Sequence, residues 1–203
     1  MKKLLFLAGI TMFVSFSSPV ETLSEKERKF AASHLKATQA ELIKSVKGLS
    51  DAQLNFKPAA DKWSVKDCVF HLAISEAALW KWVEATMKEP ANPEKRAEIK
   101  MTDDQVIAGV SSRANKVKTS ESLEPQNGKW ANADEALDTL KKDRATLIDY
   151  VKNTDGDMRN HVATQSPMGP LDAYQLVLFI SSHTNRHLQQ INEVKADPNF
   201  PKN

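Results

Sequence analysis

The sequence YQLVLFISSHTNRHLQQINEV, residues 174–194, decides the fold that we expect for this chain. Four apolar residues recur in it at helical spacing and mark one inward face: Leu176, Ile180, Ile191 and Val194. His183 and His187 are four residues apart, so a helix stacks both imidazoles on that face, one turn apart. A buried imidazole without a partner costs free energy, and a shared metal ion is one partner that would satisfy both.

The rest of the chain predicts further helices. Capping pairs mark three starts, at Ser24 with Glu27, Ser64 with Asp67 and Asn132 with Glu135, and Thr102 marks a fourth. We expect helices over about 24–48, 64–87, 103–120 and 132–153, with Val106, Val110 and Val117 inward in the third. Residues 49–62 are expected to form a loop and 89–101 a solvated linker. Six glycines and few alternating apolar runs indicate an all-α fold, a four-helix bundle with an additional short helix and a crossover connection.

The first 17 residues have the pattern of a signal peptide. Lys2 and Lys3 precede an apolar run of about 13 residues, too short to span a membrane, and small residues follow near Ser17. We therefore predict export to the periplasm or the extracellular space, with a helical domain over 24–195 and no stable membrane insertion after processing. An uncleaved N-terminal anchor is the alternative.

The charge balance excludes several function classes. Removing Lys2 and Lys3 from the 28 basic side chains leaves 26, equal to the 26 acidic ones. A neutral chain lacks the clustered basic surface that nucleic acids require, so no nucleic-acid partner is expected.

The single cysteine, Cys68, forms no disulfide within the chain. A small-molecule substrate or thiol is the expected partner, and a homodimer is one way to bury an apolar helix face.

A third histidine completes a candidate metal site. His71 lies at the edge of the apolar stripe of the second predicted helix, and the small residues Ser75 and Ala78 follow on its side. Three neutral imidazoles, from His71, His183 and His187, suit a divalent ion such as Zn²⁺, Ni²⁺ or Fe²⁺ and leave a coordination position open. A histidine pair at this spacing is also common without a metal. Position 184 is Thr rather than Glu, which disfavours the metallopeptidase motif.

Two stretches resemble the DinB-like superfamily. They are WSVKDCVFHLA at 63–73, preceded by LSDAQLNFKP at 49–58, and HTNRHLQQI at 183–191. The resemblance covers most of the chain and implies a four-helix bundle of the DinB/YfiT type with a divalent metal on His71, His183 and His187. It further implies relatives that act as bacillithiol and mycothiol S-transferases. The apparent export signal departs from the usual pattern of that family.

Other polar and aromatic residues have simpler interpretations. His34 is expected at a boundary or on the surface, with a fourth ligand or substrate contact as the alternative, and His161 is expected in a solvated loop. Cys68 is expected to be a small core residue, with an approach to the metal as the alternative. Glu76 either orients a ligand imidazole, acts as a base or lies at the bundle edge. Arg186 and Gln190 flank the histidines as supporting or surface residues. The tryptophans are expected to pack in the core or at hinges, with a substrate platform as the alternative: Trp63, Trp80, Trp82 and Trp130.

Three hypotheses follow. The first is a metal-dependent thiol transferase or hydrolase, in which the ion activates a thiol or water. The second is a non-catalytic bundle that binds a metal or small ligand in the cell envelope, favoured by the absence of a clear general base. The third is a structural helical protein whose histidines are incidental.

Overall fold

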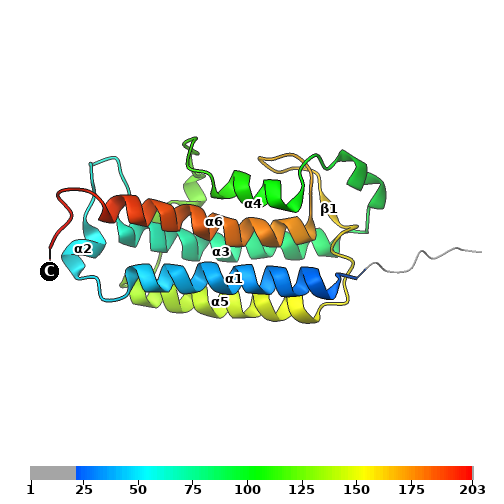
Figure 1. Ribbon diagram of the computed structural model, residues 1–203, viewed down its shortest axis with the longest axis horizontal. Coiled ribbons are helices and arrows are strands. Elements are labelled where there is room, and N and C mark those ends of the chain that lie inside the picture. The colour runs from blue at the N-terminus through cyan, green and yellow to red at the C-terminus, as the bar shows by residue number, and fades with distance from the viewer. Residues whose placement is uncertain (1–21, 203) are drawn as a thin grey trace, which may run out of the picture.

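Four long helices form the body of the molecule in the computed structural model, which describes residues 22–202. They are α1 (Glu25–Val46), α3 (Val65–Lys88), α5 (Ala133–Asn153) and α6 (Ala173–Lys195). Figure 1 shows them lying side by side as a bundle. The predicted four-helix bundle is therefore confirmed.

Local sequence signals start each of these helices. The Ser24 and Ser64 side chains accept hydrogen bonds from the third residue of α1 and α3, and the Glu27 and Asp67 carboxylates bond back to the cap. Asp172 and Gln175 form the same box before α6. These reciprocal bonds satisfy backbone N–H groups that a helix start otherwise leaves unpaired. The starts predicted at residues 24, 64 and 132 are confirmed.

The helix order produces a crossover. Helix α6 packs against α1 and α3, while α5 packs against the same two helices from the other side. In Figure 1 the colours show α3 and α5 running in the same direction, and α1 and α6 in the opposite one. Because parallel neighbours require a long connection, residues 89–132 cross over between α3 and α5. Helix α4 (Asp103–Ser111), within this connection, packs on the outer side of α6.

Short elements complete the connections. The crossover also contains the 3₁₀ turns η1 (Pro93–Glu98), η2 (Glu121–Leu123) and η3 (Pro125–Asn127). A two-stranded antiparallel ribbon, β1 (Val162–Ala163) with β2 (Leu171–Asp172), leads into α6. Since β2 contains the cap residue Asp172, the ribbon fixes where α6 begins.

Two sequence predictions were wrong in detail. The expected loop at 49–62 contains a short helix, α2 (Asp51–Asn55), started by a Ser50–Gln53 capping box. The helix expected over 103–120 ends at Ser111, and Val117, expected inward, is 73% exposed. Arg186 on α6 donates to the carbonyls of Ser112 and Asn115. This bonding holds the chain after α4 in a non-helical path along α6.

The core is divided by a polar layer. One apolar cluster includes Leu35, Leu147 and Ile180, and the other includes Leu42, Leu140 and Ile191. In α1, α5 and α6 these residues flank a buried polar residue, respectively Thr38, Arg144 and Thr184. Buried Glu76 on α3 belongs to the same layer. The histidine site described below lies at this level of the bundle, since His183 adjoins Thr184 in α6.

The N-terminal predictions lie outside the described residues. The signal peptide assigned to 1–17 falls entirely within residues 1–21, so it stays a prediction. Within 22–202, every helix is too short or too polar to cross a bilayer.

Candidate metal centre

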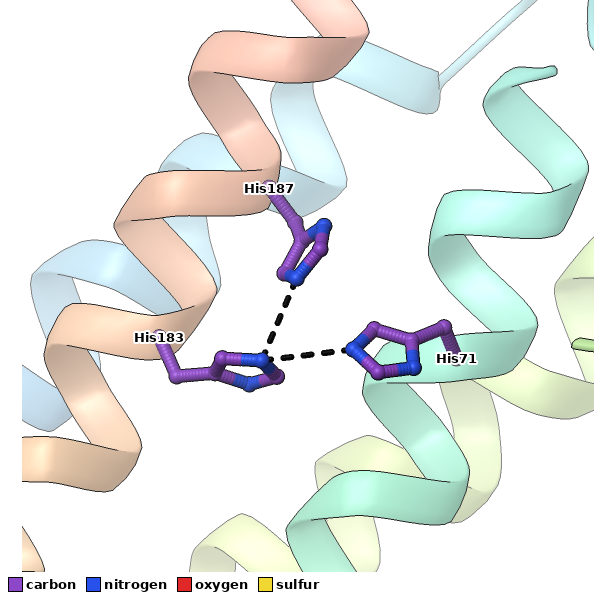
Figure 2. Close-up of side chains that lie close together, drawn as sticks. All are labelled: His71, His183 and His187. Carbon is purple, nitrogen blue, oxygen red and sulfur yellow. Dashed lines mark hydrogen bonds between the residues drawn. The ribbon is translucent and has the colours of Figure 1, made fainter. Parts of the chain in front are cut away.

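Helices α3 and α6 bring the three predicted histidines together. Figure 2 shows the rings of His71, from α3, and of His183 and His187, from α6, pointing toward a common centre. The Nε2 atom of His183 lies 3.2 Å from Nε2 of His71 and 3.1 Å from Nε2 of His187. His71 and His187 are buried, and His183 is partly exposed. The predicted convergence of residues 112 positions apart in the chain is confirmed.

Partners on the outer ring nitrogens fix how the inner ones are protonated. Nδ1 of His71 lies 2.8 Å from the Leu123 carbonyl, which only accepts, so Nδ1 donates and Nε2 presents a lone pair. Nδ1 of His187 lies 3.1 Å from Oε1 of Gln190 and is assigned the same tautomer. His183 Nε2 carries at most one hydrogen when neutral and cannot donate to both neighbours. The cluster therefore has more inward lone pairs than protons to share.

A cation resolves this excess of acceptors. Two nitrogens bound to one ion at about 2.0–2.1 Å stand roughly 3.0 Å apart in octahedral and 3.4 Å apart in tetrahedral geometry. The observed separations of 3.2 and 3.1 Å lie between those values. All three ligand atoms are within 4.8 Å of one another. The donor type, the direction of the rings and the two separations from His183 thus fit a divalent metal ion held by three imidazoles.

Burial keeps these imidazoles in the neutral form that ligates metals. It lowers the pKa of His183 to about 3, with the neighbouring His71 acting in the same direction. Burial likewise holds the pKa of His187 well below its usual value, again reinforced by His183. The pKa of His71 is lowered by burial, although its hydrogen bond to Leu123 acts the other way. Protons therefore compete weakly with a metal for these nitrogens near neutral pH.

Aromatic rings and small side chains surround the cluster. The Trp63 ring centroid lies 4.8 Å from that of His71 and 5.8 Å from that of His187. Phe179 stacks on His183 at 6.3 Å. On α3, Ser75 is buried with its hydroxyl 3.4 Å from Nε2 of His71, and Ala78, a further turn on, is exposed. Of the two small residues predicted beside His71, Ser75 contacts its ring and Ala78 lies at the surface of α3.

A chain of contacts supports His187 from outside. Gln190 Oε1 also accepts a hydrogen bond from Nη1 of Arg113, at 3.2 Å. Arg113 in turn pairs with Glu193 at 2.6 Å. Because Arg113 only donates, it requires the oxygen of the Gln190 amide to face both groups, which fixes the tautomer of His187. Of the two flanking residues in the sequence, Gln190 supports the site, whereas Arg186 instead holds residues 112–115.

Glu76 belongs to a separate buried network rather than to the metal centre. Its two carboxylate oxygens accept from Nε and Nη2 of Arg144, the second at 2.8 Å. Arg144 also donates to the Leu35 carbonyl and to the hydroxyls of Thr38 and Thr184. The interpretations of Glu76 as a base, as an orienting group for a ligand histidine or as a bundle-edge residue were all wrong, because both oxygens are committed to a buried ion pair.

The other histidines and the cysteine stand apart from the cluster. Nδ1 of His34 lies 2.7 Å from the Ser181 hydroxyl, between α1 and α6, and donates to it because that hydroxyl itself donates to the Leu178 carbonyl. His161 donates to the Asp157 carbonyl at 2.6 Å and is partly buried rather than fully solvated. Cys68 is fully buried in the apolar core, as predicted, and burial raises its thiol pKa.

The sequence did not predict the Arg144–Glu76 pair, the position of Trp63 beside the histidines, or the role of the Leu123 carbonyl. Arg144 and Glu76 interrupt the apolar stripes of their helices with opposite charges, a signal that would have revealed the pair. All four tryptophans pack against the core clusters as expected, but the sequence did not indicate that Trp63 also borders the histidines. The Leu123 carbonyl is a main-chain acceptor and has no signature in the sequence.

Comparisons with known proteins agree with this architecture. The family model for the DinB superfamily matches residues 34–191. The uncharacterized protein YuaE of Bacillus subtilis (strain 168) is 28% identical over 152 residues, 74% of this chain and 88% of YuaE. The solved structure of Bacillus subtilis YfiT, described as a probable metal-dependent hydrolase with an unusual four-helix bundle topology, aligns with a TM-score of 0.59. That alignment covers 88% of this chain and 91% of YfiT at 17% identity, which supports a shared fold.

Proposed function

The chain belongs to the DinB superfamily, and from its converged histidines we propose that it is a divalent-metal-dependent hydrolase. The observation that carries the proposal is the set of three Nε2 atoms directed at one point with 3.1–3.2 Å between neighbours. The description of YfiT as a probable metal-dependent hydrolase supports the same class of reaction.

The residues of the chain would each have a defined part. His71, His183 and His187 would hold the ion, which when bound supplies a Lewis acid and lowers the pKa of a bound water. The Leu123 carbonyl and Gln190 keep two of the rings in the ligating tautomer. Trp63 and Phe179 shield the imidazoles from water on two sides. Ser75, whose hydroxyl lies 3.4 Å from His71 Nε2, offers a polar contact beside the centre.

One observation favours a second candidate function. Within residues 22–202, the metal-ligand cluster contains no carboxylate, and the buried Glu76 is committed to Arg144. A bundle without a general base at the ion suits a non-catalytic role, binding a metal or small ligand. Thiol transfer, which the family resemblance implies, needs no such base when the ion lowers the pKa of a thiol, so it belongs in the same test.

The deciding experiment combines metal content with turnover. Purified protein is loaded separately with Zn²⁺, Ni²⁺ and Fe²⁺, and its metal content and hydrolysis of a panel of aryl esters and amides are measured, with and without a low-molecular-weight thiol. We expect about one ion per chain and hydrolysis that is lost with a chelator and in His187→Ala but retained in His161→Ala. Full occupancy without turnover would select the non-catalytic role, and thiol-dependent turnover alone would select transfer.

A further inference from the structure

A cleft of about 330 Å³ opens beside the histidine cluster at the N-terminal end of α3. The side chains that matter in its lining are Lys57, Trp63, Lys66, Asp67, Phe70 and Gln126. Trp63 connects the cleft to the metal centre, because its ring also packs against those of His71 and His187. The cleft and the histidine cluster thus share the Trp63 side chain as part of their walls.

Hydrogen-bond donors in the cleft lack acceptors among the described residues. Lys66 has no carboxylate within salt-bridge distance in the part of the chain that the structure describes, and its ammonium lies 6.0 Å from the centre of the Phe70 ring. The indole N–H of Trp63 and the side-chain amide of Gln126 make no hydrogen bond to protein within residues 22–202, and Trp63 is partly exposed while Gln126 is exposed. These three groups leave the cleft able to donate to a ligand from more than one side.

The one carboxylate in the lining is already neutralised. Asp67 pairs with Lys57 at 2.9 Å and accepts the Ser64 backbone N–H at 3.0 Å as the helix cap. Burial raises the pKa of Asp67, but the contacts with Lys57 and Ser64 outweigh it and leave the pKa below its usual value. Asp67 is therefore an occupied acceptor, and the second lysine gives the lining an excess positive charge.

We propose that this cleft binds the carboxylate or phosphate group of an anionic substrate whose reacting bond lies at the histidine cluster. The assignment rests on the proposed function and names its substrate class. Lys66 and the Trp63 N–H would bind the anion, while the Phe70 ring, packed edge-on against Trp130 at 5.5 Å, would contact an apolar body next to it. The anion would orient the substrate and contribute nothing to the chemical step.

The test measures binding without turnover. Metal-free protein is titrated with 2-naphthoate, phenyl phosphate and the uncharged 2-naphthamide, and affinities are obtained by calorimetry and tryptophan fluorescence. We expect at least one of the two anions to bind at least tenfold more tightly than the amide, and the stronger one identifies the group recognised. Lys66→Met is expected to weaken anion binding about tenfold and Lys66→Glu more. The matched control is Lys36→Met, on the exposed side of α1.

The outcomes separate this inference from the proposed function. Equal affinity for the anions and the amide, or undiminished anion binding in both Lys66 variants with native circular dichroism, would overturn the cleft assignment. Metal binding by the histidines would be unaffected by that result. Selective, Lys66-dependent anion binding by a chain that takes up no metal would instead uphold the cleft and remove the hydrolase.

Discussion

Two largely buried polar clusters lie at the same level of this bundle and differ in the helices that they join and in how donors meet acceptors. The Arg144–Glu76 cluster joins all four long helices, through Leu35 and Thr38 on α1 and Thr184 on α6. The histidine cluster joins only α3 and α6, where His71 meets His183 and His187. In the first, guanidinium donors meet oxygen acceptors. In the second, the inner nitrogens are predominantly acceptors.

This difference separates a structural cluster from a binding one. A buried ion pair whose hydrogen bonds are all made is complete within the protein. Converging lone pairs are incomplete until a cation joins them, and the surrounding protein keeps the imidazoles neutral. The buried ion pair therefore needs no ligand, whereas the three histidines are arranged to bind a cation.

Removal of one imidazole should have the largest effect on this contrast. In His187→Ala we expect metal affinity to fall by more than the roughly 10–100-fold typical of supporting groups, because a direct ligand is lost. At a free-metal concentration of about 1,000 times the wild-type Kd, the wild type should gain about 4 kcal/mol of stability on metal addition. The variant should gain little of it. Calorimetric titration and thermal unfolding with and without Zn²⁺ measure both quantities.

His34→Ala is the matched control, because His34 lies on a bundle helix outside the cluster and bonds Ser181. Its metal affinity should equal that of the wild type. Similar metal affinity in wild type and His187→Ala would contradict a three-histidine centre.

The ion-pair cluster should respond to mutation through stability rather than metal binding. Arg144→Met leaves the Glu76 carboxylate buried without its cation, so we expect a loss of about 3–5 kcal/mol in the free energy of unfolding. The double variant Glu76→Leu/Arg144→Met removes both charges and should recover most of that loss. Thr38 and Thr184 retain backbone acceptors in either case. Urea unfolding of the metal-free variants provides the comparison.

The double variant also tests the independence of the two clusters. If it folds with near-native stability, it should bind metal with an affinity close to that of the wild type. A large loss of metal affinity in this stable double variant would show that the ion pair is part of the site.

Gln190 should produce a smaller effect that is specific to the histidines. Gln190→Leu removes the acceptor for Nδ1 of His187 and frees its ring to take the other tautomer, so metal affinity should fall by about 10–100-fold. Gln189→Leu, one residue earlier, loses a hydrogen bond to the Ser111 carbonyl and should leave affinity nearly unchanged. Competition with a chelator of known affinity measures the ratio, and equal losses in the two variants would rule out a tautomer role.

Residue spacing in the sequence was sufficient to predict the paired histidines of α6 and the starts of the main helices. Four-residue spacing placed His183 and His187 on one face, and the capping pairs located the starts of the main helices. Spacing alone could not bring His71 to them, because that depends on how α3 packs against α6, and the family resemblance supplied this contact. Bonds such as Arg113 to Gln190 join the crossover to α6 through tertiary packing, which local patterns do not encode. The end of α4 was missed for the same reason.

The smallest expected effect concerns the pH dependence of stability, because the folded protein resists protonation of the buried histidines. In the folded metal-free protein burial lowers the pKa of His183 to about 3, whereas an unfolded histidine has a pKa near 6.5. Below about pH 6.5 the unfolded chain therefore takes up protons that the folded chain does not, and stability declines until the pH reaches the folded pKa. At pH 5.5 this costs about 1 kcal/mol for one such imidazole. The loss of unfolding free energy between pH 7.5 and 5.5 should thus be about 1 kcal/mol smaller in His183→Gln than in the wild type. Carboxylates contribute equally to both proteins and cancel, so identical pH slopes in urea unfolding would mean that the fold does not lower the pKa of His183.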